Sequence, residues 1–143
     1  MGELVLKGAN MRLGTSGAAV NLSDHVRSVT ITYSAEIHDR TAMGSSGRKR
    51  LAGLKDWTAA LEFNQDYAAG KVDATLFTYV GSTAKWFTIK PTSAAAGATN
   101  PRFYGNFLLP EYNPIVGAVG DLSTLTVTLQ GDGTLKRTTS STV

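Results

Sequence analysis

The chain has 143 residues, of which 42% are hydrophobic and 17% charged, with a net charge of +3 and no cysteine. These values predict a single globular domain, residues 1–143, with enough apolar side chains for one core. No run approaches the ~18 apolar residues that a membrane-spanning helix needs. The lack of cysteine excludes disulfides, thiolate zinc sites and cysteine nucleophiles. We therefore expect a protein made in a cytoplasm and held together by packing alone.

Five segments are predicted to be strands: three have the two-residue period of half-buried antiparallel strands, and two are shorter strands closed by Pro91 and Pro110. In the first, residues 27–39, apolar side chains alternate with Ser, Thr, Glu and His. The apolar series is Val29, Ile31, Tyr33, Ala35 and Ile37. The other four predicted strands are residues 56–64, 84–91, 102–110 and 122–131. Mostly strand is therefore expected.

Between the first two predicted strands, the segment from about 39 to 53 has no periodicity and is predicted to be a long loop. Residues 39–50 hold four cations and one carboxylate, a net charge of +3, so the rest of the chain sums to zero. Fixing a residue costs roughly 1–2 kcal/mol of backbone entropy. Either this is an idle surface loop, or a neighbouring subunit orders it. The candidate contact residues are Asp39, Arg40, Met43, Arg48, Lys49, Arg50, Leu51 and Leu54.

One helix is predicted between the second and third strands, because Val72, Leu76 and Val80 recur every four residues and Gly81 follows. Asp66 can cap this helix if it begins near Tyr67. The expected fold is mainly β: an antiparallel β-sandwich or barrel-forming subunit with one flanking helix and a long inter-strand loop. The polar C-terminal tail, residues 136–143, is expected to be loose in the isolated chain.

The polar sides of three predicted strands are small and mostly uncharged. They comprise Thr30, Thr32, Ser34 and Glu36, then Thr58, Ala60 and Glu62, and finally Thr124, Thr126, Thr128 and Gln130. One interpretation is an ordinary solvated sheet face, where threonine is favoured by its β-propensity. The other is a surface along which a charged molecule moves without being bound tightly.

Catalytic patterns are poor. His25 and His38 have Asp24, Glu36 and Asp39 near them in sequence, but strand geometry places Asp39 on the opposite face from Glu36 and His38. The turns "GTSG" and "GSSG" lack the form of a nucleophile elbow, and no phosphate-binding glycine loop precedes a helix. We expect no catalytic residue, no metal and no cofactor, and so no enzyme.

Four blocks follow one another along nearly the whole chain: "NLSDHVRSVTITYSAE", "DRTAMGSSGRKRLAGLKDW", "LEFNQDYAAGKVDATLF" and "VGDLSTLTVTL". They resemble the major tail tube proteins of long-tailed (siphovirus-type) bacteriophages, in particular compact ones from actinobacterial phages and prophages. The resemblance implies a structural virion protein whose hexameric rings stack into a tube that conducts DNA, assembled in the host cytoplasm. It implies tape-measure and tail terminator or tip proteins as partners, and no membrane.

On that resemblance, the loop at about 39–53 reaches a neighbouring ring or subunit. Cations that meet DNA phosphates add affinity and would hold a moving genome, so we expect Arg48, Lys49 and Arg50 to avoid the channel. The lumen-facing candidates are Thr30, Thr32, Ser34, Glu36, Thr58, Ala60 and Glu62, with Thr124–Gln130 as a further possibility. Two alternatives stay open: a tube subunit of a phage-like particle, contractile or secretion device without a genome, and a small nucleic-acid-binding module that uses the basic loop.

Overall fold

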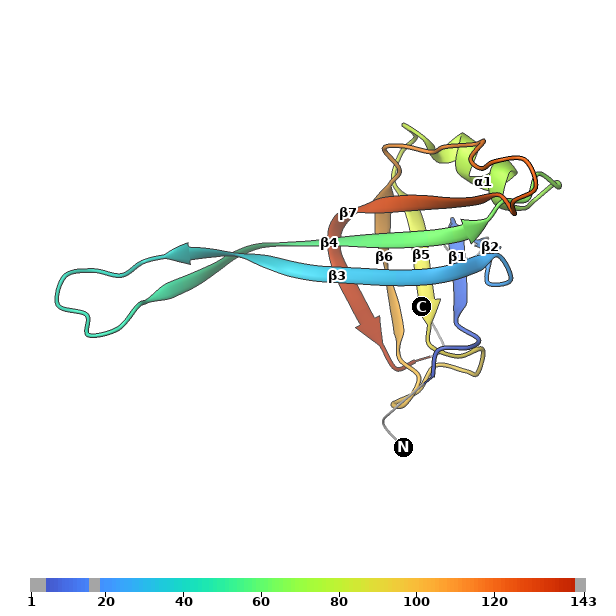
Figure 1. The fold of residues 1–143 in the computed structure, drawn as a ribbon. Coiled ribbons are helices and arrows are strands. Elements are labelled where there is room, and N and C mark those ends of the chain that lie inside the picture. Colours follow the sequence, from blue (N-terminus) through green and yellow to red (C-terminus); the bar gives the residue numbers. More distant parts are fainter. Residues whose placement is uncertain (1–4, 16–18, 141–143) are drawn as a thin grey trace.

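The computed structural model describes residues 5–15 and 19–140, which form seven strands and one helix (Figure 1). The elements are β1 (Asn10–Gly14), β2 (Val20–Asn21), β3 (Val26–Asp39), β4 (Arg50–Asn64), α1 (Val72–Tyr79), β5 (Lys85–Lys90), β6 (Arg102–Leu108) and β7 (Thr124–Thr138). All strand pairs are antiparallel, in the order β2-β1-β5-β6-β7-β4-β3. The predicted mainly β fold with one helix is confirmed.

The two layers of the fold come from one continuous sheet that bends at β7. Residues Thr124 to Gln130 of this strand pair with β4, whereas Gly131 to Thr138 pair with β6. Figure 1 shows the result: β3, β4 and the start of β7 run across the layer formed by β1, β5, β6 and the end of β7. The apolar side chains of both layers face each other between them.

Trp57 fills the bend. Its side chain is buried and its ring lies 5.7 Å from that of Phe87 in the other layer. Two glycines leave room for the indole, because a Cβ atom on Gly131 would lie 2.4 Å from Trp57 and one on Gly105 would lie 3.1 Å away. The other buried hydrophobic residues are Met11, Leu13, Leu22, Ala59, Leu61, Phe63, Val72, Leu76, Phe87, Ile89, Phe107, Leu109, Leu125, Val127 and Leu129.

The helix is shorter than its sequence pattern predicts. It begins at Val72 rather than near Tyr67, because Gly70 has a φ of +73° and residues 68–71 form a turn in which the Lys71 N–H donates to the Ala68 carbonyl. Asp66 therefore caps this turn, accepting a hydrogen bond from the Ala68 N–H at 2.9 Å. Gly81, with a φ of +69°, follows the helix as predicted. No helix among the described residues is long and apolar enough to cross a membrane.

Strand lengths also differ from the prediction. β1 and β2 have no counterpart in it, since five and two residues are too few to show a period. β7 continues to Thr138, so residues 136–138 of the expected loose tail are paired with β6. Residues 141–143 of that tail lie outside the described residues.

Replacing Gly131 with Ala is expected to lower the free energy of unfolding by about 1–3 kcal/mol, because the new methyl group overlaps the Trp57 indole. Urea denaturation of the dilute protein measures the change. Gly97→Ala is the matched control, since its Cβ would meet nothing within 4 Å, and it should leave the midpoint nearly unchanged. Equal midpoints for the two variants would contradict the packing described here.

Candidate functional site

The outer halves of β3 and β4 form an arm that projects beyond the core (Figure 1). The predicted loop is shorter than expected: Arg50 to Gly53 belong to β4, and only residues 40–49 connect the strands. At the end of the ladder, Asp39 pairs with Arg50 and Ile37 with Ala52. This pairing was not predicted from the sequence. An extra residue in β4 between Lys55 and Ala52 shifts the register and so breaks the two-residue period.

The tip of the arm is closed by hydrogen bonds between its own residues. The Arg40 N–H donates to the Lys49 carbonyl at 2.9 Å, and the Lys49 N–H donates to the Thr41 hydroxyl at 2.9 Å. The Asp39 carboxylate accepts from the Thr41 N–H at 2.8 Å and from Arg48 at 2.7 Å. These contacts, with those of Thr41 first, lower the pKa of Asp39.

The large apolar side chains of the arm are mostly exposed. Met43 at the tip is 103% exposed and Leu54 is 77% exposed, and Leu51 and Ile37 are also exposed. Large exposed apolar groups gathered on one element mark a surface for another molecule.

The cations of the arm are mostly unpaired. Arg48 contacts Asp39, whereas no side chain among residues 5–15 and 19–140 forms an ion pair with Arg40, Lys49 or Arg50. The arm therefore offers both apolar groups and free charge at its tip.

The strand register brings the three predicted polar segments onto one outer face, here called the threonine face. Its cross-strand rows are Ser28 with Glu62 and Thr126, Thr30 with Ala60 and Thr128, and Thr32 with Thr58 and Gln130. Ser34 continues the face opposite Asp56, and Glu36 lies beyond it, on the arm. Arg27 contacts Glu62 at 3.2 Å, which balances that carboxylate at the edge. Apart from Asp56, the face is thus nearly neutral, and it is lined with small hydroxyl groups.

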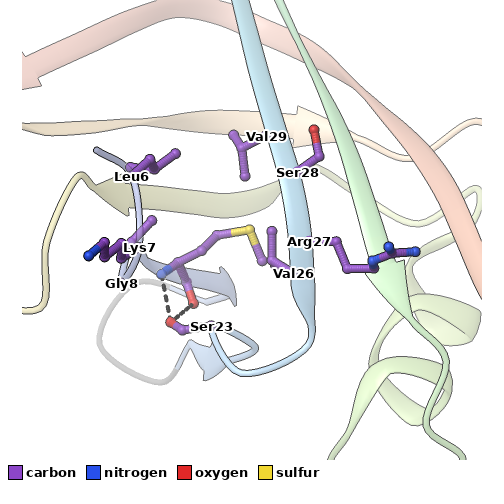
Figure 2. Close-up of a pocket in the computed structure, with 10 residues that line it drawn as sticks. Leu6, Lys7, Gly8, Ser23, Val26, Arg27, Ser28 and Val29 are labelled. Atoms are coloured by element: carbon purple, nitrogen blue, oxygen red, sulfur yellow. Dashed lines mark hydrogen bonds between the residues drawn. The ribbon is translucent and has the colours of Figure 1, made fainter. Parts of the chain in front are cut away.

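The strand edges that the sequence could not assign are β2 and β3. β2 has two residues, whereas β3 has fourteen and pairs only with β4 in the described part of the chain. Figure 2 shows a hollow of about 120 Å³ beside the start of β3, where Leu6 and Lys7 approach Val26 and Val29. The hollow lies between the segment before β1 and the unpaired edge of β3. The main-chain groups along β3 are therefore available to a partner strand.

A second apolar surface, which was not predicted from the sequence, lies at the other end of the molecule. The loop between β6 and β7 exposes four apolar side chains next to α1: Ile115, Val116, Val119 and Leu122. Gln65 and Tyr67 hold the loop by donating to the Pro114 carbonyl at 2.8 and 2.6 Å. The run "PIVGAV" in the sequence was the available signal.

Tyr112 ties the base of the same loop to α1 by donating a hydrogen bond to Asp73 at 2.8 Å. Burial, opposed by the Gln65 contact and aided by Asp73, raises the pKa of Tyr112 to about 12. The phenol therefore stays neutral and keeps its role as a donor across the physiological range. These hydrogen bonds fix the position of the loop, although its apolar side chains are exposed.

The two histidines considered as metal ligands have other partners. His25 lies between two carboxylates, with Nδ1 2.7 Å from Asp24 and Nε2 2.7 Å from Asp66. His38 lies 3.5 Å from Glu36 on the arm. Across the described ranges, no group of three or more His, Cys, Asp or Glu residues is arranged to hold a metal ion.

Comparison with known proteins gives structural matches only. No protein-family model matches the sequence, and no curated protein matches it. Among solved structures, a chain of the virion of a native gene transfer agent particle is 14% identical, with a TM-score of 0.70 over 90% of this chain and 95% of that one. A chain in the tail of an empty gene transfer agent particle, described with C6 symmetry, is 16% identical, with a TM-score of 0.70 over 90% and 94%. This protein shares their fold.

The carboxylates around His25 predict a loss of stability in acid. The pKa of Asp24 is lowered, mainly by the hydrogen bond from His25, and that of Asp66 is lowered by the Ala68 N–H and then by His25. A lowered carboxyl pKa stabilises the fold above the unfolded value, and this contribution disappears as the pH falls through the folded value. We expect the urea midpoint to drop below about pH 4, and less steeply in Asp66→Asn. Identical pH profiles for the two proteins would contradict this role.

Proposed function

We propose that this protein is the major tail tube subunit of a long-tailed phage or phage-like particle, of the compact actinobacterial type. In this proposal six copies form a ring, and rings stack into a tube. The observation that carries the proposal is the arm, which displays apolar and cationic side chains that its own domain leaves uncovered. The shared fold with a chain of a tail described with C6 symmetry supports the six-fold ring.

The two ends of the molecule are complementary in charge and in exposed apolar groups. Residues 39–50 of the arm carry a net charge of +3, whereas residues 109–123 contain Glu111 and Asp121 and no cation, a net charge of −2. No described side chain pairs with either of these carboxylates. Figure 1 places the arm on the opposite side of the core from α1 and this loop. Copies that dock the arm of one onto the loop of the next form a head-to-tail contact that repeats.

Ring closure uses the sheet edges. The long free edge of β3 has unpaired N–H and C=O groups, and an adjacent copy can satisfy them by adding a strand. Repeated six times, such pairing closes the edges of the sheets into one barrel around a lumen.

The threonine face suits the inner wall of that lumen. Hydroxyl and amide groups bind phosphate weakly compared with cations, so double-stranded DNA can pass without being held. Arg48, Lys49 and Arg50 lie on the arm and would engage the next subunit rather than the channel. A tube reconstruction with these three side chains along the channel wall would refute this assignment.

As a tail component, the protein belongs to the virion and is assembled in the cytoplasm of the bacterial host. Its further partners would be a tape-measure protein and the tail terminator or tip proteins. The likeness to gene transfer agent chains favours a phage-like particle as the second candidate, because such a particle uses the same kind of subunit. A nucleic-acid-binding module that uses the basic arm is the third, and it predicts binding that falls when Arg48 and Arg50 are replaced.

Purified protein is expected to form tubes of uniform width as its concentration rises, visible by negative-stain electron microscopy. The double variant Lys49→Glu, Arg50→Glu should abolish them, and adding Glu111→Lys and Asp121→Lys should restore assembly by exchanging the charges of the two surfaces. Lys136→Glu, an exposed site on β7 away from the arm, the loop and the free edge of β3, is the matched control. Protein that stays dispersed at every concentration would refute the tube, whereas tubes unaffected by the arm variant would refute the contact.

Amide hydrogen exchange is expected to separate the arm from the body. A two-stranded ribbon without a core is marginally stable in water, so the amides of residues 36–52 should exchange quickly in dispersed subunits. Those of residues 58–63, which pair with both β3 and β7, should be protected. Assembly should protect the arm as well, because neighbouring copies cover it. Strong protection of residues 42–50 in dispersed protein would contradict an arm that is ordered by assembly.

A further inference from the structure

The outer surface of the second layer carries a group of cations that the sequence does not reveal. The register of β1, β5, β6 and β7 aligns Arg12, Thr88, Tyr104 and Lys136 in one row. On one side of this row lie Asn10, Lys90, Arg102 and Thr138, and on the other lie Gly14, Trp86, Asn106 and Asp132. We call these three rows the basic face. It points away from the core, since Leu13, Phe87 and Phe107 alternate with it and are buried.

The positive charge of this face is mostly uncompensated. No side chain among the described residues forms an ion pair with Arg12, Lys90, Arg102 or Lys136, and Asp132 is the one carboxylate in the three rows. Burial, and then the neighbouring charges of Arg102 and Arg12, lower the pKa of Lys90. Crowded like charges of this kind are relieved when an anion binds between them.

Two buried polar atoms of the basic face have no hydrogen-bond partner. They are the Thr88 hydroxyl, on a residue that is 7% exposed, and the Nε of Arg102. Buried polar groups are nearly always bonded in folded proteins, so an orphan usually has a missing partner. Both atoms are donors, and a phosphate oxygen can accept from each once the surrounding flexible side chains move aside.

Aromatic rings stand among these cations. Trp86 and Tyr104 lie with ring centroids 5.1 Å apart, and Lys136 Nζ lies 6.0 Å from the Tyr104 centroid. A hollow of about 300 Å³ opens beside them and is also lined by Asn106 and Asp132. The hollow therefore combines ring surfaces with side chains that can hydrogen-bond to the edge of a base.

We propose that the basic face binds a single-stranded nucleic acid. In this proposal the phosphates contact Arg12, Lys90, Arg102 and Lys136. An unstacked base enters the hollow beside Trp86 and Tyr104. A single strand offers both phosphates and exposed rings, which is the combination this surface matches. An acidic protein surface would match the cations but would leave the aromatic hollow unused. The site differs from the basic arm in position and in residues.

Fluorescence anisotropy with a labelled oligothymidine of about 15 nucleotides tests the proposal. Each measurement uses the full chain with Lys49→Glu and Arg50→Glu, which reverses two of the four cations in residues 39–50 and is expected to prevent assembly. Adding Arg12→Gln and Lys90→Gln should weaken binding at least tenfold and reduce the slope of log affinity against log salt by about 1.4. Trp86→Ala should weaken binding roughly tenfold with the slope unchanged. The matched control adds Lys7→Gln and Lys55→Gln, which remove two charges elsewhere and should reduce the slope by much less.

Three results would overturn the proposal: no binding at low salt, equal losses in the control and the basic-face variant, or equally good displacement of the oligonucleotide by polyglutamate. Chemical-shift changes in the protein without basic-face substitutions give a second measurement, independent of whether those variants fold. Oligothymidine should shift the amides of residues 86–90 and 102–106, and shifts confined to other residues would also overturn it. Tube formation is scored separately by microscopy, so failure of either proposal leaves the other standing.

Discussion

The contact of the Trp57 indole with the main chain of Gly105 and Gly131 sets the shape of the subunit. Because no side chain separates the indole from these strands, β7 can leave β4 and join β6 within one continuous sheet. The bend gives the sheet two outer faces of different chemistry, nearly neutral on β3, β4 and the start of β7, and cationic on β1, β5, β6 and the end of β7. It also leaves the outer halves of β3 and β4 without a layer beneath them, which is why they project as an arm.

Net charge conceals how charge is arranged on this protein. The arm residues 39–50 carry +3 and the remainder sums to zero, which suggests a body without electrostatic character. In the fold, the opposite charges of this neutral remainder lie on different surfaces. Four unpaired cations lie on the second layer, whereas Glu111 and Asp121 lie on the loop next to α1. Three surfaces with distinct charge therefore coexist on a single small domain.

The predictable parts of the structure were those with a long, regular period. The alternation from Val29 to Ile37 and from Trp57 to Phe63 located β3 and β4, and the four-residue repeat ending at Gly81 located α1. The β4 side of the arm, up to Gly53, was predicted to be part of a loop because the register shift near Gly53 breaks the alternation. The basic face could not be predicted, because its cations are far apart in sequence and meet only through strand pairing.

Of the two surfaces that form the proposed contact, only one was predictable from the sequence. The exposure of the candidate contact residues was predictable from composition, since Met43, Leu51 and Leu54 stand among glycines, serines and cations. The surface that would receive them was not, because "PIVGAV" has no period and reads as part of a core. Only the hydrogen bonds from Gln65 and Tyr67 to Pro114 show that this run is held at the surface.

In the proposed assembly, where the arm of one copy docks on the loop of the next, growth has no built-in stopping point. Each copy that docks presents an uncovered arm identical to the one that it covers. The free energy of adding a copy is therefore the same at every length of the polymer. The finished length of such a polymer must then be dictated by a separate molecular ruler. No feature of a single copy depends on how many copies have already been added.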